Sequence, residues 1–479
     1  MISKHRAESI PSAFLTLGAA RVSVLCMNLI STSHAAKALG ASGFGLNSFA
    51  GSYVAYFMIV TSLGYDAFVA REIACDRSCM KPLVDGMLSM RLILAGLMFL
   101  LLIVSVPFLQ ISTLGRIVLL IQAVNIPGSA FGLASVYQGL RQMRVVAQRE
   151  FLSGIVNMAG LLLLVHTPED VVIAAAVSVF TMLLANLTIL LRYATDYGRP
   201  RLHWPKAFDR AQTRQSMAYF WAVLAVTVTY NVHIVLLGIM RSDAEVGLFA
   251  AGWKLFNFAI MGPNLVSTLF LPHIAGVTSQ PTARARSAEL HMQTCVICGV
   301  PIALIGEALV PHIVRVLFGA AYLPASGTVH LLLVNALVVT LNIGFGTPLT
   351  AVGRQCVLLR IAVVGAAAGV VLCSVLIPYF GIEGAAFATL VDEIIILCLF
   401  VATRPEVSVD MTLELGLRCL LAVIPAAGVA HILAQTVAAS TSDLLAVIAG
   451  GSAGVMIYGL MLRLLRVNVW QFVTQLKQL

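Results

Sequence analysis

Charged residues are scarce in this chain. They make up 11% of its 479 residues, whereas soluble globular domains carry about 25%. Hydrophobic residues reach 59%, above the roughly 45–50% of soluble domains. This balance excludes an ordinary soluble fold for most of the chain and indicates that lipid is its main solvent.

Long polar stretches are also missing. The longest link between apolar runs covers about residues 193–214. The alternate links, which would lie on the other side of a membrane, are only a few residues long. A membrane enzyme such as a glycan polymerase or a glycosyltransferase usually needs a long extramembrane loop or an acidic metal-binding motif. The sequence therefore predicts that the protein is not an enzyme.

Metal sites and nucleic-acid contacts are not expected either. Most of the nine cysteines lie inside apolar runs, where a thiol acts as a small apolar side chain. The two close pairs, Cys75 with Cys79 and Cys295 with Cys298, are weak signals by themselves. The net charge of +9 comes mainly from basic residues in the links, which is typical of a topogenic signal rather than of nucleic-acid binding. We expect no metal and no cofactor.

Apolar segments long enough to cross a hydrocarbon core of about 30 Å recur through the chain. The first is too long for a signal-peptide core and contains Arg21, so we expect an uncleaved first helix. Pro127 and Pro263 interrupt two of the segments. The predicted fold class is all-α, a polytopic membrane protein of about 14 transmembrane helices, at residues 12–36, 46–69, 87–108, 114–138, 146–166, 170–192, 215–240, 246–270, 289–313, 326–350, 357–378, 383–402, 412–435 and 444–465.

The basic residues follow the alternation of the links. Links on one side hold most of the Lys and Arg residues, and Arg141, Arg144 and Arg149 are counted among them. The links on the other side hold only Lys37, Arg116, Arg241 and Arg315. The positive-inside rule therefore places both termini in the cytoplasm.

The long link divides the chain after the sixth segment. We expect a six-helix lobe at 1–193, a cytoplasmic linker at 194–214, a second six-helix lobe at 215–403, and two additional helices with a cytoplasmic tail at 404–479. The text "FGLNSFAGSYVAYF" (44–57) opens the second helix and "VGLFAAGWKLFNFA" (246–259) opens the eighth. This echo favours two parallel repeats related by an axis along the membrane normal.

Lys254 lies inside the eighth segment. An ionised side chain facing lipid at that depth costs at least about 2.5–3.5 kcal/mol, so such residues normally face the bundle interior or a water-filled cavity. Asn257, Asn264 and Thr268 follow it at helical spacing and form a polar stripe. In the first segment, Arg21 shares a helix face with Asn28.

Two deep cations, one in each half, predict an anion-binding site. The alternative is that each cation pairs with a carboxylate such as Asp66 or Glu393. The residues expected to bind a substrate are Arg21, Asn28, Lys254, Asn257 and Asn264.

Four other ionisable residues are candidates for coupling or gating, namely Asp66, His233, Asp392 and Glu393. Asp392 and Glu393 are neighbours on one helix and point about 100° apart, so at most one faces a cavity squarely. Each could relay an ion or a proton, or could form a salt bridge that locks the second bundle. His233 is either a hydrogen-bonded structural residue or a proton switch.

Several blocks of sequence, in this order, resemble a known family. They include "ALGASGFGLNSFAGSYVAYF" (38–57), "LGYDAFVAREIA" (63–74), "VGLFAAGWKLFNFAIMGPNLVSTLFLPHI" (246–274) and "YFGIEGAAFATLVDEI" (379–394). The chain is similar to the polysaccharide transporters of the multidrug/oligosaccharidyl-lipid/polysaccharide exporter superfamily, the O-antigen (Wzx-like) flippases. Its fourteen segments are also similar in number to those of lipid II flippases, whose last two helices are thought to hold the lipid tail.

The resemblance implies two six-helix lobes around a cationic cavity, working by alternating access. The cargo would be a polyprenyl-pyrophosphate-linked oligosaccharide, carried from the cytoplasmic to the periplasmic leaflet of a bacterial inner membrane for surface polysaccharide synthesis. The implied partners are that glycan, membrane lipid, and a polysaccharide polymerase or glycosyltransferases, with no nucleic acid. His233 departs from the family, where Asp is common at this place. A multidrug or cation antiporter of the same superfamily is the alternative function.

Overall fold

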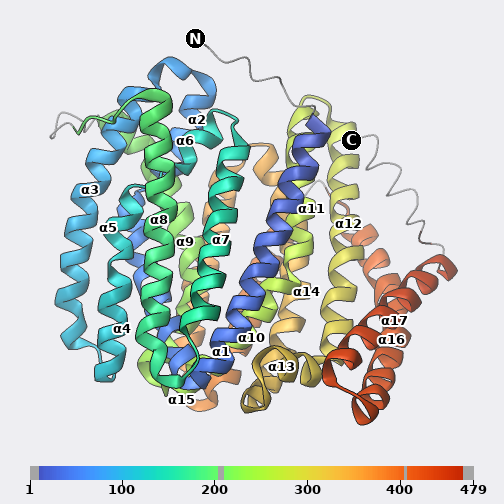
Figure 1. Ribbon diagram of the computed structural model, residues 1–479. Coiled ribbons are helices and arrows are strands. Elements are labelled where there is room, and N and C mark those ends of the chain that lie inside the picture. Colours follow the sequence, from blue (N-terminus) through green and yellow to red (C-terminus); the bar gives the residue numbers. More distant parts are fainter. Residues whose placement is uncertain (1–9, 203–209, 404–406, 466, 468–479) are drawn as a thin grey trace. The chain divides into compact units, whose positions relative to one another are not determined.

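The computed structural model describes residues 10–202, 210–403, 407–465 and 467, and it describes the backbone alone for 10–22, 210–212 and 218. Every regular element in this part of the chain is a helix (Figure 1). The chain forms two compact units, residues 1–227 and 228–479. Helix α9 (Arg210–Met240) begins in the first unit and ends in the second.

The described part of unit 1 contains eight further α-helices and three 3₁₀ turns. The α-helices are α1 (Ile10–Ser62), α2 (Tyr65–Cys75), α3 (Met80–Ser105), α4 (Thr113–Ala123), α5 (Asn125–Ala130), α6 (Ala134–Gly139), α7 (Met143–Leu164) and α8 (Val171–Tyr197). The 3₁₀ turns are η1 (Arg77–Cys79), η2 (Val106–Phe108) and η3 (Pro168–Asp170). Helix α1 is kinked at Gly40, whose φ of 66° and ψ of 176° are accessible to glycine because it has no Cβ.

Unit 2 contains the remaining elements. These are α10 (Asp243–Ala259), α11 (Met261–Gly276), α12 (Pro281–Ala308), α13 (Val310–Phe318), η4 (Ala320–Ala325), α14 (Ser326–Ala351), α15 (Gln355–Ala402), α16 (Val409–Ser440) and α17 (Asp443–Leu464). Helix α15 is kinked at Gly381, with a φ of 57°.

The helices give a polytopic membrane protein. Among the described residues, eleven stretches are long and apolar enough to cross a membrane. Two of them, in α1 and α15, hold two helices each because of the glycine kinks. Helix α7 is not among the eleven, and its apolar sequence is interrupted by Arg149, Glu150 and Asn157. With α7 included, with α4–α6 and α10–α11 each taken as one broken helix, and with the short helices α2 and α13 left out, the described chain contains fourteen long helices, which confirms the predicted all-α polytopic class.

Proline explains the break between α4 and α5 and the break between α10 and α11. A proline inside a helix cannot bond to the carbonyl four residues before it, and its ring clashes with that carbonyl. Helix α4 ends at Ala123, four residues before Pro127, and α10 ends at Ala259, four residues before Pro263. The expected segments 114–138 and 246–270 are therefore both interrupted at the position that the proline sets.

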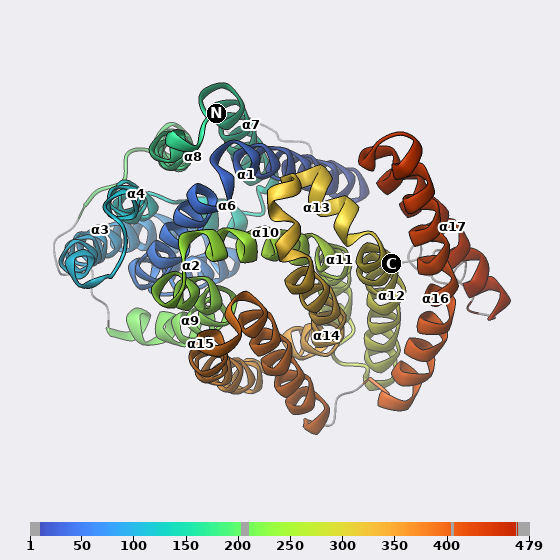
Figure 2. The same cartoon turned by 90° about the horizontal axis from the view of Figure 1, so that it is seen from below.

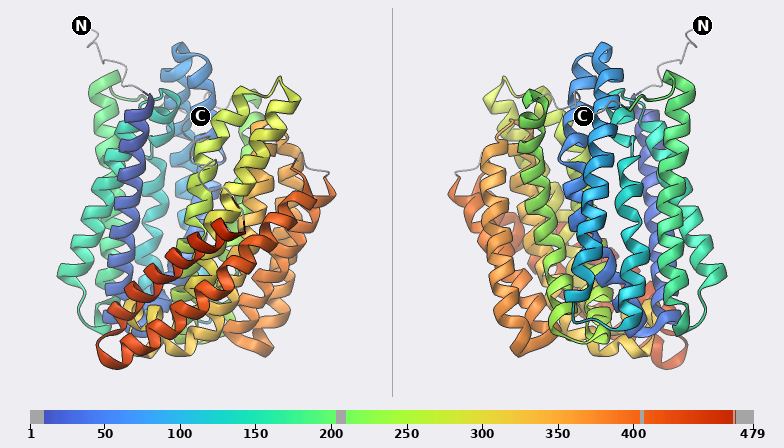
Figure 3. Two further views of the ribbon diagram at one scale, coloured as in Figure 1. Left: turned by 90° about the vertical axis from the view of Figure 1, so that its right-hand side faces the viewer. Right: turned by 90° about the vertical axis from the view of Figure 1, so that its left-hand side faces the viewer.

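The last two helices pack through small residues. Ala426, Ala430 and Ala434 of α16 are fully buried, and a Cβ added at Gly450 of α17 would lie 2.7 Å from the Ala430 carbonyl oxygen. Figure 3 shows the two helices side by side. Small residues at helix contacts allow close backbone approach where lipid supplies no hydrophobic drive for association.

Candidate functional site

The polar stripe on α10 and α11 lies on an exposed face. Lys254, Asn257, Asn264 and Thr268 are exposed, whereas the aromatic residues Phe249, Trp253, Phe256 and Phe270 of these helices are buried. The Asn257 side chain donates to the Trp253 carbonyl at 2.7 Å, and that of Asn264 donates to the Ile260 carbonyl at 3.0 Å. Each amide therefore bonds to its own helix and still has a side-chain oxygen that can accept.

Lys254 makes no hydrogen bond or ion pair with another described residue of unit 2. Glu393, a carboxylate considered as its partner, instead accepts from the Asn342 amide at 2.7 Å. An ammonium group without a carboxylate neighbour is a natural partner for an anion.

Arg21 lies in the helical backbone of α1, but its side chain is outside the part of the chain that the structure describes. Asn28, seven residues further along the same helix, is exposed and lines a pocket of about 320 Å³ in unit 1. The pocket lies between α1, α7 and α8, which run side by side (Figures 1 and 2). Its lining consists of Val24, Asn28, Arg149, Glu150, Ser153, Gly154, Asn157, Ser178, Thr181, Met182 and Ala185.

Arg149 is fixed within this pocket. Its Nη2 donates to the Asn186 side-chain oxygen at 2.7 Å, and the Asn186 amide donates to the Gly128 carbonyl at 2.9 Å. The sequence pattern placed Arg149 in a link, but it lies six residues into α7, about 9 Å along the helix axis. The signal that could have located it is the Arg149–Glu150 pair, with Ser153 and Asn157 following at helical spacing in a run that ends in apolar residues.

Asp66 has a structural partner. Its carboxylate lies 2.6 Å from the guanidinium of Arg91, a side chain that is only 2% exposed. Arg91 also donates to the Gly132 carbonyl at 2.9 Å. This pair connects the first turn of α2 to the interior of α3, so the cation that Asp66 neutralises is Arg91.

His233 lies in an aromatic cluster of unit 2. Its ring centroid is 3.9 Å from that of Trp253 and 5.1 Å from that of Phe249. The side chain is 1% exposed, and its Nε2 has no partner among the described residues. His233 therefore points away from the exposed face that carries Lys254.

Asp392 and Glu393 are buried in the second half of α15. Glu393 is held by Asn342 of α14, whereas Asp392 Oδ1 has no hydrogen-bond partner in the described chain. Asp392 Oδ2 lies close to Gly369, because a Cβ added at Gly369 would be 2.7 Å from this oxygen. Neither carboxylate forms an ion pair with a described residue, so the salt bridge considered for them is not seen there.

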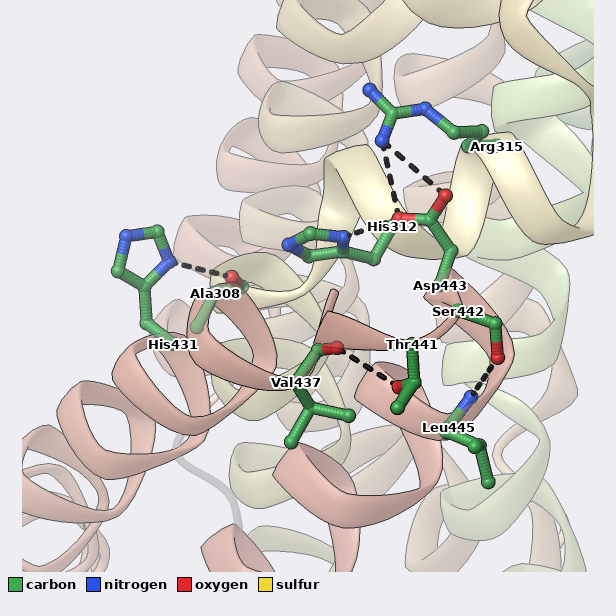
Figure 4. Close-up of polar contacts among 9 residues, drawn as sticks. All are labelled: Ala308, His312, Arg315, His431, Val437, Thr441, Ser442, Asp443 and Leu445. Atoms are coloured by element: carbon green, nitrogen blue, oxygen red, sulfur yellow. Dashed lines mark hydrogen bonds and ion pairs between the residues drawn. The ribbon is translucent and has the colours of Figure 1, made fainter. Parts of the chain in front are cut away.

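One polar cluster was not anticipated. Asp443, the first residue of α17, accepts from His312 Nδ1 at 2.7 Å and from Arg315 at 3.1 Å, both on α13 (Figure 4). Nearby, His431 of α16 contacts the Ala308 carbonyl at 3.1 Å. These contacts fasten the α16–α17 hairpin to the end of α12 and to α13.

A family model described as "Polysaccharide biosynthesis protein" matches residues 14–277, more than half of the chain. The chain belongs to this family. The predicted resemblance to a polysaccharide family is thereby confirmed. A search of curated proteins finds no match.

Solved structures share the fold. One similar structure is a lipid II flippase, MurJ, in an inward closed conformation, with a TM-score of 0.77, 13% identity, and coverage of 95% of this chain and 99% of that one. An inward-facing MATE multidrug transporter of the MOP superfamily has a TM-score of 0.62 at 12% identity, covering 81% and 94%. The MATE transporter DinF-BH in complex with R6G has a TM-score of 0.63 at 15% identity, covering 83% and 96%. The fold is therefore that of the MOP superfamily.

Proposed function

We propose that this protein is a flippase that moves a polyprenyl-pyrophosphate-linked oligosaccharide from the cytoplasmic to the periplasmic leaflet of a bacterial inner membrane. The observation that carries the proposal is Lys254, an exposed ammonium group on a membrane-spanning helix. Membership of a polysaccharide biosynthesis family supports a glycan cargo. The name of the similar lipid II flippase supports a lipid-linked one.

Lys254 and Arg21 would hold the pyrophosphate. Two unit charges 4 Å apart attract each other by about 4 kcal/mol at an effective dielectric constant of about 20. A phosphate partner would therefore offset the cost of keeping an ammonium group within the membrane, estimated above at about 2.5–3.5 kcal/mol. Asn28, Asn257 and Asn264 would supply neutral hydrogen-bonding groups beside the charges.

The proposed moving parts are a lobe at 1–193 and a lobe at 215–403, joined by the linker at 194–214. Alternating access would expose the cations first to the cytoplasmic and then to the periplasmic leaflet. Both termini would lie in the cytoplasm, in agreement with the distribution of basic links. The helices within 404–479 would lie beside the lipid tail, and exposed apolar side chains such as Leu417, Ile424 and Met456 suit that contact.

The membrane potential would assist export. A pyrophosphate diester carries about two negative charges at neutral pH, and each is worth about 2.3 kcal/mol per 100 mV of potential. Because the cell interior is negative, outward movement of the headgroup is downhill. Return of the empty carrier moves its cations back through part of the field, which reduces the net gain.

A second candidate is a cation antiporter, and the buried carboxylates favour it. Asp392 has an oxygen without a partner in the described chain, and Glu393 has one amide donor. Buried acidic residues of this kind can carry a proton or a sodium ion through a membrane protein. In the proposed flippase the same pair, with His233 and Asp66 as further candidates, would couple or gate transport.

The cellular test uses Lys254→Ala, with Lys254→Arg as the charge-retaining variant and Lys81→Ala as a control at an exposed position near the start of α3. We expect Lys254→Ala to lower glycan export at normal protein levels and to cause lipid-linked glycan to accumulate. Lys254→Arg should export more glycan than Lys254→Ala because it keeps the positive charge, and Lys81→Ala should leave export at the wild-type level. Normal export by Lys254→Ala would contradict the proposed role of this residue.

A further inference from the structure

We infer that the pocket between α1, α7 and α8 of unit 1 is a sugar-binding subsite, which takes one or two neutral, hydroxyl-rich rings of the cargo. This inference rests on the proposed function and deepens it. It assigns separate sites to the two parts of the cargo headgroup, with the pyrophosphate at the deep cations and the first sugars in the pocket.

The lining of the pocket is polar on all three helices. On α7, Glu150, Ser153 and Asn157 follow helical spacing, so they share one face. On α8, Ser178 and Thr181 do the same, and α1 adds Asn28. Amide, hydroxyl and carboxylate groups can donate to and accept from sugar hydroxyls, each of which both donates and accepts.

The formal charge of the described residues that line the pocket is balanced. Arg149 contributes one positive charge and Glu150, its neighbour in the chain, contributes one negative charge. A phosphate or a uronic acid would gain from the guanidinium but would meet the carboxylate. A neutral sugar ring can use both groups, because its hydroxyls donate to the carboxylate and accept from the guanidinium. The balance therefore favours a neutral ring over the pyrophosphate.

Two polar atoms in the pocket lining are ready for a ligand. Thr181 is only 5% exposed, and its hydroxyl has no hydrogen-bond partner among the described residues. Nε of Arg149 also has no hydrogen-bond partner among the described residues, and Asn186 fixes the position of this side chain. Buried polar groups in native proteins are nearly always paired, so unpaired ones call for a partner.

The volume of the pocket and the residues that line it further restrict the class of ligand. A volume of about 320 Å³ lies at the lower end of the roughly 300–1,000 Å³ typical of small-molecule sites. It suits one or two rings rather than a complete oligosaccharide repeat. None of the described residues that line the pocket is aromatic, whereas planar organic cations are usually bound against aromatic faces. The pocket therefore favours a sugar over a multidrug substrate.

The test measures binding to the full-length protein in lipid nanodiscs. The probes are citronellyl pyrophosphate alone and the same lipid carrying glucose, galactose, N-acetylglucosamine or glucuronic acid. The variants are Glu150→Gln and Thr181→Val, which preserve side-chain size. Their matched controls are Glu169→Gln, at an exposed position, and Thr195→Val, whose hydroxyl donates to the Arg192 carbonyl of its own helix, outside the pocket lining.

We expect at least one neutral sugar to tighten binding about tenfold over the bare pyrophosphate lipid, as one or two added hydrogen bonds to charged or buried groups would do. Each pocket variant should remove most of that gain and leave the affinity for the bare lipid unchanged, and the controls should keep the gain. The inference is overturned if no neutral sugar adds affinity, if the gain survives both pocket variants, or if glucuronic acid gains most.

Transport by the same proteins separates the two proposals. Suppose that the wild-type protein flips lipid-linked glycan but the affinity gained from the sugar is unchanged in the pocket variants. The subsite proposal is then wrong and the flippase proposal stands. If the sugar gain depends on Glu150 and Thr181 but no lipid-linked glycan is flipped, the flippase proposal is wrong and the subsite stands.

Discussion

The ion pair between Asp66 and Arg91 predicts an asymmetric response to mutation. Arg91 is 2% exposed and Asp66 is 56% exposed. Asp66→Asn removes the counter-charge and leaves a buried guanidinium whose remaining described partner is the Gly132 carbonyl. Arg91→Met removes the buried cation and leaves a carboxylate that water can reach, so it should be the milder change.

The expected loss of unfolding free energy in Asp66→Asn follows from the partial burial of this ion pair. Removing one partner of a fully buried pair costs about 3–5 kcal/mol, while exposed pairs are worth about 0–1 kcal/mol. Because water reaches one partner here, we expect Asp66→Asn to lower the free energy of unfolding by about 2 kcal/mol. The double variant should resemble Arg91→Met, because the cation that needs Asp66 is then absent.

The assay is denaturant unfolding of the purified protein in detergent, read by intrinsic fluorescence, with all four members of the double-mutant cycle. Asp196→Asn, which breaks the exposed Arg192–Asp196 pair of α8, is the matched control and should change stability by less than about 0.5–1 kcal/mol. Equal effects of Asp66→Asn and Asp196→Asn, or strictly additive effects of the Asp66 and Arg91 variants, would refute this reasoning.

Three other predictions concern the hairpin and the topology. Gly450→Val should separate α16 from α17 and cost about 1–3 kcal/mol, because its Cβ would meet the Ala430 carbonyl at 2.7 Å; an unchanged unfolding midpoint would contradict this packing. Asp443→Asn removes the charge that holds His312 and Arg315, so hydrogen exchange at the turn between α16 and α17 should rise, and unaltered exchange would count against the tether. Reporters fused after Thr167 should read as periplasmic and those after Arg210 as cytoplasmic, and reversed readings would overturn the orientation.

The number and type of helices could be predicted from the sequence because the length and the apolar character of a run decide which segments can cross a membrane. The breaks in α4–α5 and α10–α11 follow from Pro127 and Pro263, whose effect on the preceding turn is local. The short helix α13 could not be separated from the link around it, because it is only nine residues long.

The candidate site was predictable only in part. The exposed stripe from Lys254 follows from helical spacing along one stretch of sequence. The pocket of unit 1 depends on three helices that meet only after folding, so its residues looked like isolated polar positions. Arg149 was counted with the basic residues of the preceding link, Arg141 and Arg144, although the expected segment already began near residue 146, and in the structure it lies inside α7. The pairing of Asp66 with Arg91 also depends on tertiary contacts between α2 and α3.

The most direct test of the flippase proposal is transport by the purified protein in proteoliposomes. The substrate is a fluorescent polyprenyl-pyrophosphate glycan, and potassium with valinomycin sets the membrane potential. We expect flipping that accelerates when the side corresponding to the cytoplasm is negative, and that falls at least about tenfold in Lys254→Ala but not in Lys81→Ala. Flipping that ignores both Lys254 and the potential, and instead follows a proton or sodium gradient, would contradict the account and favour the antiporter with its buried carboxylates at Asp392 and Glu393.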